Sequence, residues 1–485
     1  MGPKIETCQL SPTLRASRVV NGLWQVADME RGGQNLDASE TSKYMMPYLE
    51  AGFTTFDMAD HYGSAEIIAG TFKQGLQAPD TVQLLTKWVP RPGKNSKEEV
   101  RAAIITALNR LQSKKLDLLQ FHAWNYADPN WLDCLYWLQD LKEEGLVANI
   151  GLTNFDTPHL RIALSSGIEV VSNQVSYSVV DQRAGGAMAK LCGEHHVKLL
   201  AYGTVAGGFL ADKWLNKPEP KLDGQATWSQ MKYKRFIEEA GRWDKFQHVL
   251  SVLSNVAKRH NASIANVASR YILEQPAVGS VIIGVRLGRS EHVADNAKLF
   301  QFHLTEGDKK DIRGVQALLS AIHGDCGDEY RKPPYLTASG DLSHHLDAIP
   351  PPFPVFEGSD GRSKALSGTV WEDMAGFSRA VKKGNRILVS GTTATHGERA
   401  IGGHDPAAQT HFVIDKIEGA LQSLGGKLEH VVRTRVFVRH MDDWEAISRA
   451  HGERFKEIQP ANTLVRADII GEGYLVEMEA EAIVE

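Results

Sequence analysis

At 485 residues the chain is too long for one ordinary core, and its 42% apolar and 23% charged residues are typical of a globular protein with about two or more domains. A net charge of −5 excludes the strongly basic surface that binding to nucleic acid requires. Four scattered cysteines, no secretory signal at the start and no run of about 18 apolar residues predict a soluble, cytoplasmic protein without a structural metal site.

Short apolar runs alternate with amphipathic stretches of helical period in the first part of the chain. The runs read RVVNGLWQV, FTTFD, VQLLTKW, LDLLQFH, VANIGLTN, VVSNQV, VKLLAYG and SVIIGV. Between them, residues 96–113 predict a helix, because Ser96 and Glu99 have the spacing of a capping box and apolar residues follow along one stripe. Repeated strand and helix units require a parallel sheet, and eight such units predict an α/β fold, a (β/α)8 TIM barrel. A doubly wound sheet is the alternative, but the glycine-rich fingerprint expected after its first strand is missing.

The composition changes after the predicted barrel. Residues 346–364 contain three consecutive prolines followed by Gly, Ser and Asp, which is typical of a linker. From residue 365 to 485 we expect a small α+β domain, with helices over 405–424 and 443–456 and two nearly adjacent strands at the end. The predicted domains are therefore 1–345 and 365–485, joined by 346–364.

Polar side chains end three of the predicted barrel strands. Asp57, Lys87 and His122 each close an apolar run, and Tyr62 follows Asp57 in the next loop. The carboxyl ends of barrel strands form the active-site face of such folds. A buried lysine requires an acid partner, so we expect Asp57 to pair with Lys87, and the cation to lower the pKa of Tyr62 and make it a general acid. We expect His122 to donate a hydrogen bond to the same substrate oxygen.

The motifs GFTTFDMADHYG, LLTKW, LDLLQFHAW and GLTNF resemble successive signatures of the aldo-keto reductases, over residues 10–345. This resemblance implies an NADPH-dependent oxidoreductase that reduces an aldehyde, a ketone or an imine, with NAD not excluded as cofactor. The tetrad would be Asp57, Tyr62, Lys87 and His122. His292 stands where many members carry an arginine for the 2′-phosphate of NADP. The implied cofactor-binding residues are Gly22, Trp24, Thr153, Asn154, Gln174, Tyr202, Gly203, Gly207, Gly284, Arg286, Arg289, Asp295 and Asn296.

Aromatic residues just past the predicted strand ends favour an aromatic-walled substrate pocket for a flat or apolar carbonyl compound. Packing in the core is the alternative for each of them. We expect the segment 211–244 to be a loop that closes over the site, and Asp60 and His61 to tune their loop or face solvent. The expected pocket residues are Trp24, Trp88, Trp124 and Tyr126.

The tail resembles the RidA (YjgF) family of small trimeric enamine and imine deaminases, through GFSRAVKKGNRILVSG, EHVVRTRVFVRHMDDWEAI and PANTLVRADII. The resemblance implies a chorismate-mutase-like fold, a homotrimer and a pocket that includes Phe377, Asn462 and Glu477. Asn462 replaces the arginine that clamps a substrate carboxylate, so hydrolysis of iminocarboxylates is not expected. We expect the tail to assemble the protein, with binding of an imine or enamine intermediate as the weaker hypothesis. Period-two charges also predict cross-strand pairs between Arg433, Arg435, Arg439 and Glu477, Glu479, Glu481.

Two other functions stay open at this point. The barrel could be a cofactor-sensing, non-catalytic binding module, although the intact tetrad argues against it. The whole chain could also be bifunctional, a reductase fused to an active enamine or imine deaminase. The substrate and the pathway are not specified by the sequence.

Overall fold

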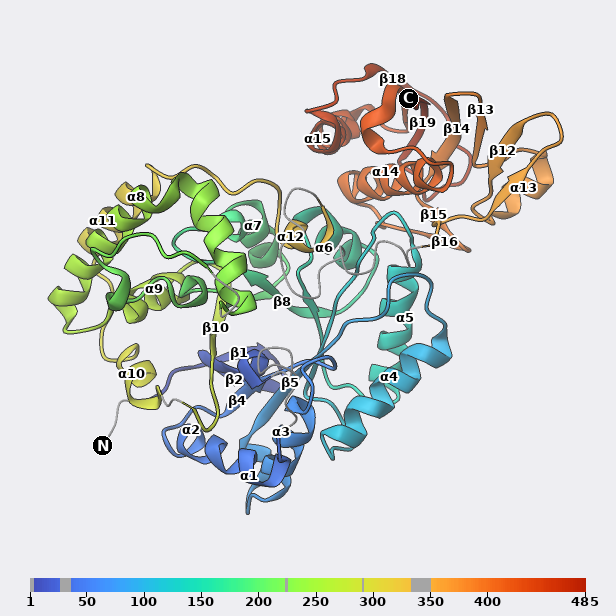
Figure 1. Cartoon of the computed structure of the whole chain (residues 1–485). Coiled ribbons are helices and arrows are strands. Elements are labelled where there is room, and N and C mark those ends of the chain that lie inside the picture. Colours follow the sequence, from blue (N-terminus) through green and yellow to red (C-terminus); the bar gives the residue numbers. More distant parts are fainter. Residues whose placement is uncertain (1–3, 27–35, 223–225, 290–291, 333–349) are drawn as a thin grey trace.

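Eight parallel strands form a closed barrel in the N-terminal part of the chain (Figure 1). The computed structural model describes residues 4–26, 36–222, 226–289, 292–332 and 350–485. The barrel strands are β3 (Val19–Gly22), β4 (Thr55–Asp57), β5 (Gln83–Trp88), β6 (Leu118–Phe121), β7 (Ile150–Thr153), β8 (Val170–Ser176), β9 (Lys198–Tyr202) and β10 (Val278–Gly284). β10 pairs with β3 and closes the sheet, which confirms the predicted barrel and excludes the open doubly wound alternative.

Helices cover the outside of the barrel (Figure 1). The predicted capping box is present, since Glu99 N donates to Ser96 Oγ at 3.2 Å and Ser96 N donates to Glu99 Oε2 at 2.7 Å. The helices of this part are α1 (Ala38–Ser42), α2 (Met46–Glu50), α3 (Ala65–Gln74), α4 (Lys97–Arg110), α5 (Asn130–Glu143), α6 (Thr157–Ser165), α7 (Ala187–Glu194), α8 (Trp228–His260), α9 (Ile264–Leu273), α10 (Val293–Lys298), α11 (Glu306–Gln316) and α12 (Asp328–Arg331).

The segment 211–244, expected to be a loop, is helical from Trp228 onward. α8 begins at a capping box in which Thr227 and Gln230 exchange hydrogen bonds. Its first turns bury Tyr233 and other apolar side chains against the barrel. The loop assignment is wrong here because a buried apolar stripe at helical spacing outweighs a composition rich in Trp, Lys and Pro.

β1 (Thr7–Ser11) and β2 (Leu14–Ser17) form an antiparallel hairpin that packs against the end of the barrel opposite the carboxyl ends of its strands. The apolar side chains of the hairpin form one cluster with side chains that point into the barrel interior, and this cluster fills that end. The cluster consists of Leu10, Leu14, Ala16, Val20, Leu85, Leu118, Leu200 and Ile282. The carboxyl ends of the strands are thereby left as the end of the barrel at which a site can form.

The C-terminal part folds into a seven-stranded sheet with α14 (Pro406–Ser423) and α15 (Trp444–Phe455) packed on it, which confirms the predicted α+β domain and both of its helices (Figure 1). Its strand order is β11-β12-β13-β14-β19-β17-β18. Only the β17 and β18 pair is parallel among the described pairs of this sheet. The remaining elements are β11 (Val355–Glu357), β12 (Arg362–Ala365), α13 (Val370–Ala375), β13 (Ala380–Lys383), β14 (Arg386–Thr393), β15 (Thr395–His396), β16 (Arg399–Ala400), β17 (Val431–Val438), β18 (Ala461–Arg466) and β19 (Val476–Ile483).

Two strands of this sheet come from the stretch 346–364 or its border. β11 lies within that stretch and pairs with β12, which in turn pairs with β13. The exact domain boundaries therefore stay a prediction. Among the predicted cross-strand charge pairs, Arg435 on β17 and Glu479 on β19 form an ion pair, whereas Arg439 donates to the backbone oxygen of Tyr474 at 2.6 Å.

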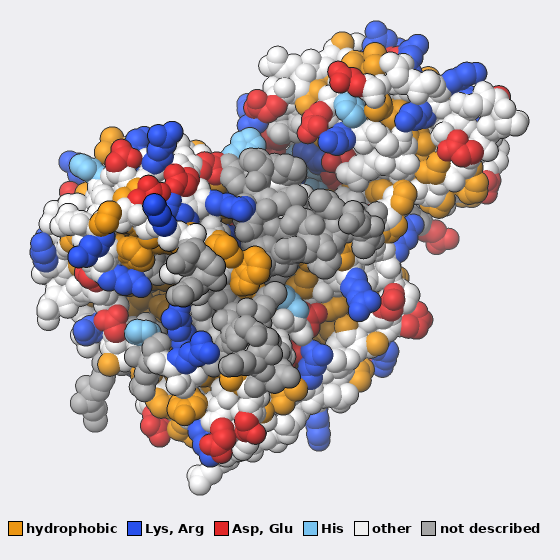
Figure 2. Space-filling view, in the orientation of Figure 1, with side chains coloured by type: hydrophobic (Ala, Val, Ile, Leu, Met, Phe, Trp, Pro, Cys, Tyr) orange, Lys and Arg blue, Asp and Glu red, His pale blue; other side chains and the backbone are white. Residues whose placement is uncertain are grey.

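The two domains are in contact along α6 and α14 (Figure 1). Arg161 forms an ion pair with Asp405 at 2.8 Å, and His159 forms one with Asp415 at 2.9 Å. On the face shown in Figure 2, acidic and basic side chains of the described residues are mixed over both domains. No helix of the described residues is both long enough and apolar enough to span a membrane.

Candidate active site

Asp57 and Lys87 form a buried ion pair at the carboxyl ends of two neighbouring barrel strands. Asp57 is the last residue of β4, and Lys87 lies on β5. Nζ of Lys87 is 2.5 Å from Oδ2 of Asp57 and donates to the backbone oxygen of Met58 at 2.9 Å. The two side chains are 5% and 4% exposed. Burial lowers the pKa of Lys87, since it disfavours the charged form, and Asp57 offsets only part of this effect.

Two amides hold Asp57 in place. Nε2 of Gln120 and Nε2 of Gln174 each lie 2.9 Å from Oδ1 of Asp57, and Gln174 also donates to Oε1 of Gln120 at 2.7 Å. The amide nitrogen of Gln174, expected to contact a nicotinamide carboxamide, is therefore engaged within the protein. Sequence reasoning missed Gln120, although a buried amide two residues before His122 points to the same side of its strand and needs a partner.

The ring of Tyr62 lies beside this ion pair, and its phenolic group holds its proton strongly. Nζ of Lys87 is 4.9 Å from the ring centre of Tyr62. Burial raises the pKa of Tyr62 well above its ordinary value, and the charge of Asp57 raises it further. The expectation that Lys87 lowers this pKa is wrong, because desolvation and the nearby carboxylate outweigh the ammonium. Tyr62 consequently keeps its proton at neutral pH, which is the state that a proton donor needs.

His122 presents an unpaired ring nitrogen to the site. It follows β6 directly, and Nδ1 lies 3.3 Å from the backbone oxygen of Thr153. Burial, aided by the charge of Arg331, lowers the pKa of His122 well below its ordinary value, so the ring is neutral. A carbonyl oxygen only accepts, so Nδ1 carries the proton. Nε2, which has no hydrogen-bond partner among the described residues, then accepts rather than donates, contrary to the role expected from the sequence.

A cavity of about 560 Å³ lies beside these residues, within the usual size range of ligand sites. Trp24 and Trp124 supply aromatic wall, with ring centres 4.9 Å from that of Tyr62 and 4.5 Å from that of His122 respectively. The expected site residues that line the cavity are Gly22, Trp24, Asp57, Tyr62, Lys87, His122, Trp124, Thr153, Asn154, Gln174, Tyr202, Gly203, Gly207, Gly284, Arg286, Asp295 and Asn296.

Three expected residues lie away from the cavity. Trp88 is buried and packs on Phe121, with ring centres 5.4 Å apart, because side chains alternate along a strand and Lys87 is the one that faces the site. Tyr126 is buried in a stack described below, and Arg289 is exposed. Core packing, the alternative noted for the aromatic residues, describes Trp88 and Tyr126.

Asp60 and His61 stay in their loop. Oδ2 of Asp60 accepts from Val89 N at 3.1 Å, and Oδ1 of Asp60 lies 2.9 Å from Nδ1 of His61. His61 also reaches the cavity wall. These contacts agree with a role of Asp60 in shaping the loop that carries Tyr62.

Lys232 and Tyr330 line the cavity without having been singled out in the sequence. Nζ of Lys232 lies 2.8 Å from the phenolic oxygen of Tyr330 and 3.2 Å from Oε1 of Glu329. The same ammonium is 5.0 Å from the ring centre of Tyr202. Only the tertiary fold brings α8 and α12 together here, so no local motif reveals the cluster.

The donor set of the cavity fits a nicotinamide dinucleotide. Asn154 has a φ of 58°, and its Oδ1 accepts from the hydroxyl of Tyr202 at 2.7 Å, which fixes its amide at the cavity wall. Arg286 supplies a guanidinium of the kind that binds phosphate. In the part of the chain that the structure describes, no group of three or more His, Cys, Asp or Glu side chains could hold a metal ion.

Of the three residues expected in a pocket of the C-terminal domain, Asn462 lies apart from the other two. Nδ2 of Asn462 on β18 donates to Oγ1 of Thr434 at 2.9 Å, and Thr434 is buried. Asn462 pairs with Thr434, and Thr434 pairs with Ala480 on β19. Glu477, three residues before Ala480, therefore lies on the opposite face of the sheet. Burial raises the pKa of Glu477. The ring of Phe377 packs against Arg379, 5.4 Å away, and the charge of Arg379 partly offsets the raised pKa of Glu477, so Phe377 and Glu477 both lie near this arginine.

Comparison with known proteins confirms both resemblances. Residues 18–317, more than half of the chain, match the aldo/keto reductase family, and the chain therefore belongs to that family. Residues 370–484 match the family described as Endoribonuclease L-PSP, which is the RidA/YjgF family.

Individual relatives match different shares of the chain. The uncharacterized protein SCO2049 of Streptomyces coelicolor is 39% identical over 125 residues, 26% of this chain and 93% of that protein. Aflatoxin B1 aldehyde reductase member 2 of Rattus norvegicus is 29% identical over 222 residues, 43% of this chain and only 60% of that protein. The structure of the glycerol dehydrogenase AKR11B4 from Gluconobacter oxydans matches with a TM-score of 0.54 at 20% identity, covering 66% of this chain and 97% of that one, which shows the shared barrel fold.

Proposed function

We propose that this protein uses NADPH to reduce the carbonyl group of an aldehyde or ketone, or an imine. The observation that carries this proposal is the buried Lys87–Asp57 pair beside the protonated Tyr62, at a cavity that His122 also lines. Membership of the aldo/keto reductase family supports it. The aromatic walls of the cavity favour a flat or apolar substrate.

The tetrad protonates and orients the oxygen atom of a carbonyl substrate. The hydride comes from C4 of the nicotinamide when NADPH is bound. Tyr62 donates its phenolic proton to the oxygen as negative charge develops there, and an alkoxide is basic enough to take it. Lys87 stabilises the resulting tyrosinate, and Asp57 keeps Lys87 in position. Nε2 of His122 then accepts a hydrogen bond from the new hydroxyl group and orients it.

A substrate screen tests the proposal. The wild-type protein should oxidise NADPH in the presence of at least one aldehyde, ketone or imine. Tyr62→Phe should bind NADPH with unchanged affinity and lose turnover by about 10²-fold or more. Tight NADPH binding without oxidation over any substrate would favour the cofactor-sensing module instead.

The preference for NADPH over NADH rests on Arg286. This side chain lines the cavity and can bind a 2′-phosphate, while His292, also at the cavity, stands in place of a second arginine. We therefore propose a moderate preference for NADPH rather than a strict one.

For the C-terminal domain we propose assembly of a homotrimer, in the cytoplasm, rather than an independent deaminase reaction. Asn462 cannot supply the fixed charge that clamps a carboxylate, and Glu477 lies on the other face of the sheet. Light scattering should give the mass of three chains. Release of ammonia from an enamine substrate would favour the bifunctional alternative.

A further inference from the structure

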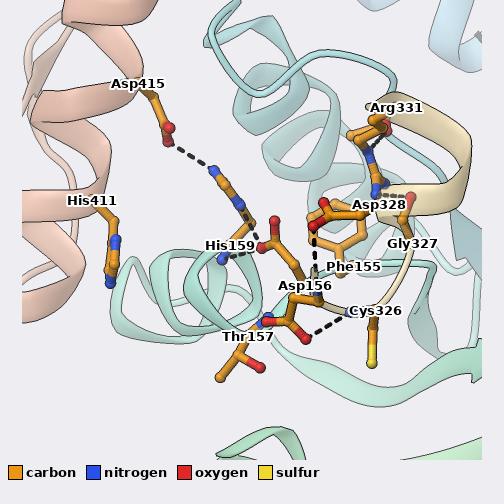
Figure 3. Close-up of polar contacts among 12 residues, drawn as sticks. Phe155, Asp156, Thr157, His159, Cys326, Gly327, Asp328, Arg331, His411 and Asp415 are labelled. Carbon is orange, nitrogen blue, oxygen red and sulfur yellow. Dashed lines mark hydrogen bonds and ion pairs between the residues drawn. The ribbon is translucent and has the colours of Figure 1, made fainter. Parts of the chain in front are cut away.

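A buried histidine joins the two domains. His159 lies on α6, with Nδ1 at 2.5 Å from Oδ1 of Asp156 and Nε2 at 2.9 Å from Oδ2 of Asp415 on α14 (Figure 3). Each of the three side chains is at most 5% exposed. A carboxylate oxygen only accepts hydrogen bonds, so both ring nitrogens carry protons and the ring is an imidazolium shared between the domains.

The ring of His159 is stacked on Tyr126. Their ring centres are 3.4 Å apart and their planes differ by 6°. The guanidinium carbon of Arg331 lies 4.5 Å from the ring centre of Tyr126. His159 already covers one face of that ring, so Arg331 lies over the other. We call these three residues, His159, Tyr126 and Arg331, the His159 stack.

The far end of the His159 stack holds the wall of the cavity. Arg331 donates to the backbone oxygen of Asn154 at 2.6 Å and to that of Ala123, the residue after His122, at 2.7 Å. Asn154 has a φ of 58°, in the left-handed region that asparagine adopts more readily than most residues. Its backbone oxygen accepts from Arg331 and its side-chain oxygen accepts from Tyr202, so these two contacts fix both ends of the residue at the cavity wall.

We propose that the C-terminal domain is a working part of the reductase site, because Asp415 positions Asn154, and with it the cofactor, through the His159 stack. The inference rests on the proposed function, since it assumes that Asn154 contacts NADPH. Asp415 and the members of the His159 stack are positioning residues and do not touch the reacting atoms. Loss of the Asp415 charge leaves a buried imidazolium with one carboxylate, which shifts α6 and the stacked rings.

Two matched variants of the full chain test the inference. Asp415→Asn removes the charge that faces His159 and also Arg454, whose Nη1 donates to Oδ1 of Asp415 at 2.6 Å, whereas His159→Gln changes the His159 contact and leaves that of Arg454. Asp405→Asn removes the charge from the other interdomain pair, with Arg161, and keeps an N-cap for α14. Asp415→Asn should raise the Kd of NADPH, measured by fluorescence titration, by about threefold to thirtyfold and should raise the KM of NADPH without changing that of the carbonyl substrate. Asp405→Asn should leave both within about twofold of wild type.

Each other result has a defined meaning. Equal NADPH affinity of wild type and Asp415→Asn overturns the inference, as does an equal loss in both variants, which would assign the effect to docking in general. Failure of wild type to bind NADPH overturns the proposed function instead. If circular dichroism shows that Asp415→Asn is unfolded, His159→Gln replaces it, and it should raise the Kd of NADPH in the same way. Unchanged affinity of that variant also overturns the inference.

Discussion

The ammonium of Lys87 lies 2.5 Å from the carboxylate of Asp57, in a site from which water is nearly excluded. Each charge compensates the other. Removing one partner would leave an uncompensated buried charge, which lowers the free energy of unfolding by about 3–5 kcal/mol. The proposed chemistry needs the same pair, since a tyrosinate forming at Tyr62 requires a cation beside it. This proposal therefore predicts that stability and activity are coupled at these two residues.

Breaking this pair should show that coupling. Lys87→Met and Asp57→Asn should each lower kcat, Lys87→Met by about 10²-fold or more, and each should reduce the free energy of unfolding by about 3–5 kcal/mol. The double variant should lose less stability than the sum of the two, because it buries no unpaired charge. Chemical denaturation of the four proteins measures this, and strictly additive losses would contradict the buried pair.

The amide of Gln120 should matter although it lies behind the tetrad. Gln120→Leu leaves Asp57 with one fewer donor, so kcat should fall by about tenfold, or about 1.4 kcal/mol in barrier height. Thr86→Val is the control, because Thr86 is equally buried but donates to Glu66 at 2.6 Å. That variant should lose stability and keep its kcat. Equal kcat values for the two variants would rule out a role of Gln120.

The pH profile should be set by Lys87 on the alkaline side. His122 has a lowered pKa and Tyr62 a raised one, so neither changes charge between about pH 6.5 and 10. Lys87 has a lowered pKa and should therefore lose its proton before Tyr62 does as the pH rises above neutrality. Asp57 is what raises that pKa, so Asp57→Asn should move the alkaline limb of kcat/KM to lower pH. If the alkaline limb of kcat/KM has the same position in Asp57→Asn as in wild type, the limb reports the titration of a group other than Lys87.

Domain docking should weaken at alkaline pH. Burial lowers the pKa of His159, but the two carboxylates outweigh it, so the net pKa is raised. A raised pKa means that the contribution to stability is complete below about pH 6.5 and is lost as the pH rises through the folded-state value. Hydrogen exchange of α6 and α14 should therefore quicken with pH beyond the intrinsic rate, and His159→Gln should remove this dependence. The charged or titratable groups around His159 are Tyr126, Asp156, Asp415, Arg331, Lys332, His411 and Arg454.

The cofactor preference should depend on Arg286. Arg286→Ala should raise the Kd of NADPH by about tenfold or more and leave that of NADH nearly unchanged, since only NADPH carries the 2′-phosphate. Arg313→Ala, an exposed arginine on α11, is the matched control. Equal losses for both cofactors would place Arg286 elsewhere on the dinucleotide.

The barrel, and the placement of Asp57, Tyr62, Lys87 and His122 at one cavity, were predictable from local sequence. Apolar runs predict the eight strands, and a polar residue at or near the end of a strand lies at the carboxyl end of the barrel, as Asp57 and Lys87 do. The helical start of α8 was missed, because its buried stripe is diluted by charged residues over the first turns. The direction of the Tyr62 pKa was also missed, since it depends on burial, which a motif does not reveal.

Contacts between distant segments could not be predicted. Lys232 meets Tyr330, and His159 meets Asp415, only because the folded barrel and the docked domain bring them together. Within the C-terminal domain, strand period predicted that Arg435 and Glu479 pair, but not that Arg439 turns to backbone oxygens.

The most direct test of the proposed chemistry separates cofactor binding from reduction. NADPH that carries deuterium at the transferred position of C4 is mixed with wild type or Tyr62→Phe and with a substrate found in the screen, and the product is analysed by mass spectrometry. Wild type should form an alcohol or amine that carries the deuterium on carbon, and Tyr62→Phe should bind the labelled NADPH equally well and transfer almost none. Transfer by Tyr62→Phe at the wild-type rate would contradict proton donation by Tyr62.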